Sequence, residues 1–143
     1  MKMKISVFKP IWYEPINMGL DNGIMLRGKY LQSELKTPIS DWHPHDTEIC
    51  YWRKFWGFRN EVVTTFGQEY ECADIDLDIS KLLIIIQILE KFMDREYFEE
   101  NGDSIWSYEQ NLINTIRNIN NIRSVIEYME LHPEVECYFY DSY

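Results

Sequence analysis

The sequence predicts one α+β domain in which three main helices dominate and the terminal segments form a small sheet. Its 143 residues are the length of a single ordinary domain. Hydrophobic residues make up 45% of the chain, and six glycines and five prolines are too few for a disordered or fibrous protein. Apolar side chains recur at helical spacings in two segments, and a third segment is apolar almost all round, which together indicate three helices. We therefore expect a single domain over residues 1–143, irregular or β-containing over 1–45, with a helical core and a C-terminal strand over 46–143.

The front of the chain carries few helical signals. Residues 4–8 could form a short strand, and residues 10–45 contain four of the five prolines, which is typical of irregular or hairpin-like structure. Residues 21–23 read Asp-Asn-Gly and predict a turn. Residues 24–26 are apolar and fit either a strand or the start of a helix.

The first helix is expected to begin after Pro44 and to end at Gly67, with Asp46 or Thr47 as its N-cap. Its apolar stripe is formed by Ile49, Trp52, Trp56, Val63 and Phe66. Over residues 72–79 aspartates alternate with apolar side chains, which predicts a short edge strand with Ile75 and Leu77 pointing inward.

The second helix is expected to begin at Asp78 or Ser80 and to continue to about Phe98. Residues 82–89 are apolar almost all round, so this helix should be central in the fold or covered by another chain.

The third helix is capped by Ser104 or Ser107 and stopped by Pro133. Its expected buried stripe is Ile105, Tyr108, Leu112, Ile116, Ile119, Ile122, Ile126 and Met129. Apolar and polar side chains alternate over residues 135–140, which predicts a terminal strand.

Charge is distributed unevenly along the chain. Residues 1–59 carry a formal charge of +3, residues 60–143 carry −13, and the total is −10. Such an excess attracts a basic partner, and it repels nucleic acid and anionic membranes. The candidate partner-binding residues are therefore acidic side chains of the second half of the chain, namely Glu90, Asp94, Glu99, Glu100, Glu127, Glu130 and Glu134. Tyrosines near the C-terminus either add contact area to such an interface or pack on the sheet.

No catalytic or cofactor motif is present, so we expect a non-enzymatic protein without a cofactor. Asp74, Asp76 and Asp78 do not fit a calcium-binding EF-hand loop, because Ile79 and Ile85 stand where glycine and glutamate are required. His43 and His45 could supply two metal ligands, but no third ligand has a recognisable spacing, and we expect no metal.

The sequence also predicts where in the cell the chain is found. The first ten residues hold only a short apolar stretch, unlike a signal peptide, and no apolar run is long enough to span a membrane. Three widely spaced cysteines, Cys50, Cys72 and Cys137, fit reduced thiols in a cytoplasmic protein. We therefore expect a cytoplasmic location.

Aromatic and basic residues are densest over residues 50–59. On a helix, Trp52, Phe55, Trp56 and Arg59 would share a face, which favours a core stripe over a docking or base-stacking surface.

The stretch Tyr51-Trp52-Arg53-Lys54 resembles a motif that lies on a helix in small bacteriophage and bacterial proteins without an established activity. The layout is also similar over roughly residues 41–143, since two longer helices and an aromatic C-terminal strand follow. Residues 56–58 differ, because a polar segment containing histidine is expected there. The resemblance brings no site residues and implies a setting among phage, prophage or mobile-element genes, where small acidic inhibitors are common.

These observations predict an acidic, non-catalytic binding protein that neutralises a basic partner acting on nucleic acid. The partner would be a toxin nuclease, with the chain as its immunity protein, or a host defence nuclease, with the chain as a phage-encoded inhibitor. The alternative is a structural or accessory protein of a phage-like element that self-associates through the helix over residues 82–89. The sequence leaves the oligomeric state open.

Overall fold

The computed structural model describes residues 20–28, 46–67 and 74–142. Within these ranges the strands are β1 (Asp21–Arg27), β2 (Asp46–Arg53), β3 (Ile75–Leu77) and β4 (Cys137–Ser142). The helices are α2 (Trp56–Phe66), α3 (Ile79–Lys91), α4 (Arg95–Asn101) and α5 (Tyr108–Leu131). This confirms the predicted helix-rich α+β class. The predicted strand at 4–8 and most of the segment 10–45 lie outside the described residues.

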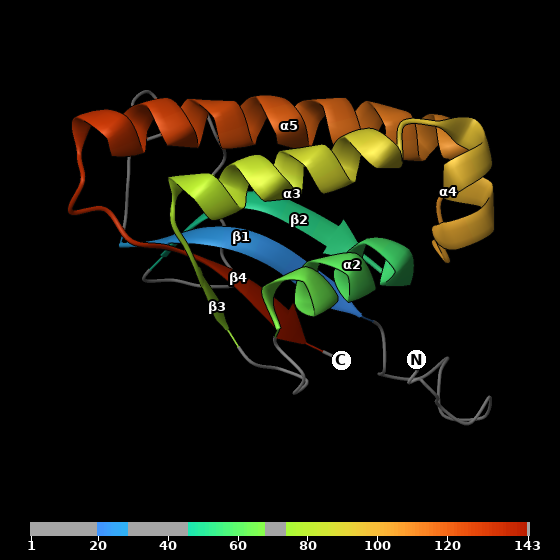
Figure 1. Cartoon of the computed structure of the whole chain (residues 1–143), viewed down its shortest axis with the longest axis horizontal. Helices are drawn as coiled ribbons and strands as arrows, with labels where there is room; N and C mark the ends of the chain where they lie inside the picture. Colours follow the sequence, from blue (N-terminus) through green and yellow to red (C-terminus); the bar gives the residue numbers. More distant parts are fainter. Residues whose placement is uncertain (1–19, 29–45, 68–73, 143) are drawn as a thin grey trace.

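The four described strands form one antiparallel sheet in the order β2-β1-β4-β3. Figure 1 shows α2, α3 and α5 on one face of this sheet, with α4 at the end where α5 begins. The sheet is larger than the expected sheet of terminal segments, because β2 and β3 come from the middle of the chain. The predicted C-terminal strand is confirmed as β4.

Residues 21–23 belong to β1, and the turn predicted there is wrong. Asn22 is opposite Trp52 of β2 on one side and Asp141 of β4 on the other, so the segment is paired on both sides. Gly23 is needed because a Cβ at this position would lie 2.3 Å from Cε2 of Tyr140, whose ring covers the strand. Sheet pairing therefore overrides the local Asp-Asn-Gly turn signal.

The helix predicted from residue 46 is wrong in its first half and confirmed in its second. Asp46–Arg53 is strand β2, and Asp46 is a strand residue whose carboxylate accepts a hydrogen bond from the backbone N–H of Gly28 at 2.9 Å. Lys54 then takes a positive φ of 52°, and α2 follows. As predicted, Gly67 ends the helix in the left-handed conformation, with φ 76°. The Tyr-Trp-Arg stretch of the resemblance motif is thus on a strand.

β3 is confirmed as an edge strand among those described, with Ile75 and Leu77 buried and Asp76 exposed. Asp78 caps α3 through its side chain, which accepts from the N–H of Lys81 at 2.9 Å. The expected extension of this helix to Phe98 is wrong. It ends at Lys91, and Asp94 caps a separate helix, α4, by accepting from the N–H of Tyr97.

Of the two predicted caps, Ser104 and Ser107, it is Ser107 that begins α5, and it forms a reciprocal capping box with Gln110. Pro133 follows its end, as expected. The predicted stripe holds in the C-terminal half, where Ile119, Ile122 and Met129 are buried. It fails toward the N-terminus, because Ile105, which precedes α5, and Ile116 are 57% and 45% exposed. The side chains buried there instead are Asn111, Thr115 and Asn118.

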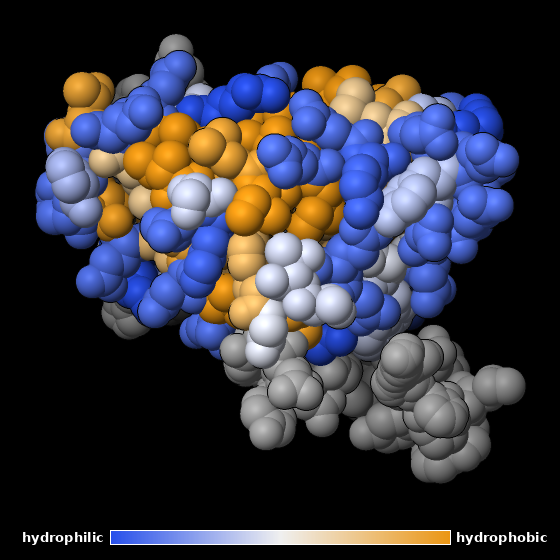
Figure 2. Space-filling view, viewed as in Figure 1, coloured by the Kyte–Doolittle hydropathy of each residue, from blue (hydrophilic) through white to orange (hydrophobic). Residues whose placement is uncertain are grey.

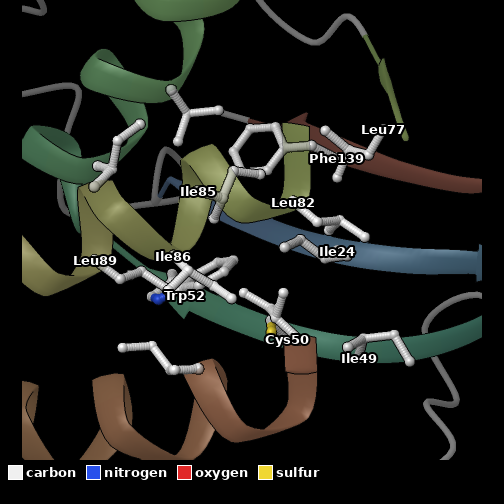
Figure 3. Packing of buried hydrophobic residues seen from close by; sticks show 14 of the residues in the cluster. Ile24, Ile49, Cys50, Trp52, Leu77, Leu82, Ile85, Ile86, Leu89 and Phe139 are labelled. Carbon is white, nitrogen blue, oxygen red and sulfur yellow. The ribbon is translucent and has the colours of Figure 1, made fainter. Parts of the chain in front are cut away.

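The hydrophobic core lies between the sheet and the helices. Figure 3 shows Ile24, Trp52 and Phe139 of three strands facing Leu82, Ile85, Ile86 and Leu89 of α3. An aromatic group of Trp52, Phe55 and Phe58 fills the space under α2, with ring centroids 4.4 Å apart for Trp52 and Phe58. The aromatic segment 50–59 therefore contributes to the core, the role that the sequence analysis favours over a docking or base-stacking surface.

Candidate functional site

The whole net charge of the chain arises between Asp74 and Ser142. This segment contains fifteen acidic and five basic residues, a formal charge of −10. Residues 46–67, by contrast, contain three residues of each sign. The carboxylates of the segment are mostly exposed, and they gather at the two ends of α5.

The first group surrounds α4, and we call it the α4 region. It comprises Glu90, Asp94, Glu96, Glu99, Glu100, Asp103 and Glu109, all of them exposed. The two basic residues of this stretch are already engaged. Arg95 binds Glu109 at 2.6 Å and Glu99 at 3.4 Å, and Lys91 binds Glu61 of α2 at 2.6 Å.

These ion pairs shift the pKa values of the residues that form them. Other carboxylates of the α4 region take part in no ion pair with a described residue. The Arg95 guanidinium lowers the pKa of Glu109, and the hydrogen bond to Glu61 raises the pKa of Lys91. Within the described part of the chain Glu96, Glu100 and Asp103 have no ion-pair partner. The α4 region is therefore anionic beyond what its own cations neutralise.

The second group lies at the other end of α5, near β3. Its exposed members are Asp74, Asp76, Asp78, Glu127, Glu130, Glu134 and Glu136. Arg27 binds both Asp76 at 2.8 Å and Glu136 at 3.1 Å. Hydrogen bonds from the Lys81 N–H and the Ser80 hydroxyl lower the pKa of Asp78, which keeps this helix cap ionised at neutral pH.

The structure divides the seven predicted partner-binding residues between these two groups. Glu90, Asp94, Glu99 and Glu100 are in the α4 region, whereas Glu127, Glu130 and Glu134 are at the far end of α5. From Glu109 to Glu130 the helix rises about 32 Å. The seven residues therefore do not form one continuous patch.

A groove with a volume of about 700 Å³ opens beside β3, and we call it the β3 groove. Its floor is apolar and includes Leu77, Ile79, Met129, Val135 and Cys137. Charged residues at its rim are Arg27, Asp76, Asp78 and Glu136, which together carry a net charge of −2. Sequence reasoning missed this groove, because its floor combines β3 and β4 with the start of α3 and the end of α5, which are far apart in the sequence.

Exposed apolar side chains lie on the helical layer. Figure 2 shows an apolar area over α3, bordered by hydrophilic side chains. Leu83 of α3 is 46% exposed and Ile113 of α5 is 61% exposed. Most of the apolar segment 82–89 is nevertheless buried in the core of its own chain, including Leu82, Ile85 and Leu89. Leu83 and part of Ile84 still face solvent, and self-association through this segment stays a prediction.

The C-terminal tyrosines are mostly integrated into the fold. Tyr138 is 4% exposed and donates to Asp46 at 2.5 Å, and the ring of Tyr128 lies 4.4 Å from that of His132. Tyr51 of β2 donates to Asp21 at 2.5 Å, and its burial, reinforced by this carboxylate, raises its pKa to about 12. Packing on the sheet is thus the role of Tyr138, while Tyr143 lies outside the described residues.

The described ranges contain no cluster of three or more histidine, cysteine, aspartate or glutamate side chains that could hold a metal ion. The candidate ligands His43 and His45 fall outside these ranges, as does Cys72. Cys50 and Cys137 are buried free thiols, and burial raises the pKa of Cys137 to about 12, which makes it a poor nucleophile.

One buried polar cluster was not predicted. Arg59 of α2 binds Asp141 of β4 through Nε at 3.0 Å and Nη2 at 2.8 Å, and Asn22 of β1 donates to the other oxygen of Asp141 at 2.7 Å. The cluster lies between the sheet and α2, where Nη1 of Arg59 also donates to Asn60 at 2.9 Å and Oδ1 of Asn22 is buried without a hydrogen-bond partner among the described residues. The cluster therefore fixes α2 to the sheet rather than forming an open site.

None of the helices in the described ranges is both long and apolar enough to cross a membrane. In comparisons with known proteins, the chain matches no family model, no curated protein and no solved structure.

Proposed function

We propose that this chain is an acidic, non-catalytic binding protein that neutralises a basic protein acting on nucleic acid. The supporting observation is the placement of the net charge. All ten surplus negative charges arise from residues 74–142, and their carboxylates are exposed at both ends of α5. A bacterial toxin nuclease or a host defence nuclease has the complementary property, a cationic surface that binds phosphates.

The mechanism begins with electrostatic steering. An anionic surface accelerates the encounter with a cationic one. Once the two proteins meet, short-range contacts hold the complex together. Covering the cationic surface of the nuclease then blocks its access to nucleic acid. No bond is made or broken in the binding protein, so the proposal requires only surface charge and shape.

The proposal is tested with a purified basic nuclease of the toxin or defence class. The association rate constant is measured by stopped-flow fluorescence as salt is raised from about 50 to about 500 mM. Because this change shortens the Debye length from about 14 Å to about 4 Å, the rate should fall at least about tenfold. Nuclease activity should fall in proportion to the complex formed.

Two matched triple variants locate the contact. One carries Glu90→Gln, Glu99→Gln and Glu100→Gln in the α4 region, and the other carries Glu127→Gln, Glu130→Gln and Glu134→Gln at the opposite end. Each removes three exposed charges, and Asp94 is kept because it caps α4. One set should slow association more than the other. A rate that is independent of salt and unchanged in both variants would contradict the proposal.

A further inference from the structure

The β3 groove combines three properties that favour the binding of a partner segment. It is concave, with a volume of about 700 Å³, which lies within the range of pockets that hold a ligand. Its floor is apolar, and Leu77 and Cys137 are 4% and 3% exposed. Its rim carries three carboxylates against one guanidinium.

We propose that the β3 groove binds a short segment of the basic partner that alternates aliphatic with arginine or lysine residues. This inference rests on the proposed function and names the point of contact. Aliphatic side chains of the segment would lie on Leu77, Met129 and Val135. The cationic groups would bind Asp76, Asp78 and Glu136 at the rim, where the net charge is −2.

Arg27 shows that the rim can hold a guanidinium. Its Nη2 lies 2.8 Å from Asp76, its Nε lies 3.1 Å from Glu136, and its Cζ lies 4.4 Å from the centroid of the Tyr138 ring. The side chains of Asp76 and Glu136 remain 86% and 71% exposed in this arrangement, so each keeps accessible oxygen atoms. Carboxylates of this kind accept further charged donors readily.

The apolar floor of the groove distinguishes it from the α4 region. A cationic side chain with a long aliphatic stem gains from an apolar floor under a charged rim, because the stem is removed from water while the head stays paired. The α4 region offers carboxylates on exposed helix surfaces and can steer a partner. The β3 groove adds a surface on which an anchoring side chain can be buried.

The first test uses the full chain with ¹³C-labelled methionine methyl groups and a synthetic peptide, acetyl-Leu-Arg-Leu-Arg-Leu-amide. Met129 lines the groove, whereas Met93 lies between α3 and α4 and serves as an internal control. Titration should shift the Met129 methyl resonance and leave that of Met93 in place. Peptides with serine for leucine, or with glutamate for arginine, should shift Met129 much less.

The second test compares two double variants with equal loss of charge by fluorescence polarisation of the labelled peptide. Asp76→Asn with Glu136→Gln brings the rim from −2 to zero and should weaken binding about tenfold. Glu99→Gln with Glu100→Gln in the α4 region should change the affinity less than twofold. All four side chains are exposed, so both variants should keep the fold.

The groove assignment is overturned if Met129 does not move, if the glutamate peptide binds equally well, or if the two double variants bind alike. A nuclease that associates in a salt-dependent way while Met129 stays unmoved would remove this inference alone. Peptide binding in the groove together with salt-independent nuclease association would instead support the groove and remove the proposed function.

Discussion

At the scale of single residues, the ion pair of Arg59 and Asp141 stands apart from the others in the described residues. Its side chains are 12% and 2% exposed, whereas in the pair of Arg27 and Asp76 the values are 42% and 86%. A buried ion that loses its partner stays desolvated and uncompensated, while an exposed one is solvated by water. The same chemical pairing therefore has very different effects on stability in the two places.

The substitution Asp141→Asn should lower the free energy of unfolding by about 3 kcal/mol, because it leaves the Arg59 guanidinium buried without a counter-charge. The matched change Asp76→Asn should cost less than about 1 kcal/mol. Urea unfolding followed by tryptophan fluorescence measures both. Equal effects of the two changes would show that the Asp141 site is solvated in solution.

At the scale of secondary structure elements, the sequence predicts helices and strands well where local signals agree with long-range pairing. β3, β4 and α5 follow from alternation and spacing, and capping chemistry narrows the starts of α3 and α5 to two residues each, of which Asp78 and Ser107 are the caps. β2 does not, because its pairing with β1 shifts register between Ile24 and Met25, a β-bulge that leaves both Ile49 and Cys50 buried. The resulting spacing of three between Ile49 and Trp52 imitates a helix.

The same limits apply to the functional surfaces. The acidic character of residues 60–143 can be read from the sequence, but its separation into two groups depends on how α4 and α5 pack. The β3 groove could not be predicted, because its floor and rim meet only after β4 has paired with β3 and with β1. The polar inner face at the start of α5 could not be predicted either. Its Asn111 side chain donates to the carbonyl of Phe92 at 3.2 Å, a contact that exists only after α5 has packed against the end of α3.

The contact between α2 and the loop after α4 provides a test at this scale. Gly57 donates to the carbonyl of Gly102 at 2.8 Å, and a Cβ on Gly57 would lie 1.9 Å from the carbonyl oxygen of Asn101. Gly57→Ala should therefore destabilise the fold by more than about 2 kcal/mol, since backbone must move. Gly67→Ala meets no atom within 4 Å and has only the cost of its φ of 76°, about 1 kcal/mol.

Thermal and urea unfolding of the two glycine variants rank these costs. A smaller loss for Gly57→Ala than for Gly67→Ala would mean that the loop after α4 is not held against α2 in solution.

At the scale of the whole molecule, ionisation links the fold to pH. Burial raises the pKa of Cys137 from 9.0 to about 12, and burial together with Asp21 raises that of Tyr51 from 10.0 to about 12. Burial also raises the pKa of Tyr140. These groups ionise more easily in the unfolded chain than in the folded one, so their contribution to stability is complete below about pH 9 and is lost as pH rises toward about 12.

The urea midpoint should accordingly fall between about pH 9 and about pH 12, and tyrosinate absorbance should rise together with unfolding. Tyr51→Phe removes one of the ionising groups and should make the fall shallower than in the unchanged chain. A midpoint that stays constant over this interval would contradict the burial of these side chains.

The carbonyl of Ile49, at the bulge of β2, accepts a hydrogen bond from the Asn121 side chain of α5 at 3.0 Å. α5 therefore hydrogen-bonds to the backbone of β2, one edge strand of the described sheet. The opposite edge strand is β3, which has three residues. An exposed edge strand presents unpaired backbone N–H and C=O groups, with which strands of other chains can pair and aggregate. Because β3 has only three residues, this edge of the described sheet presents little backbone with which a foreign strand could pair.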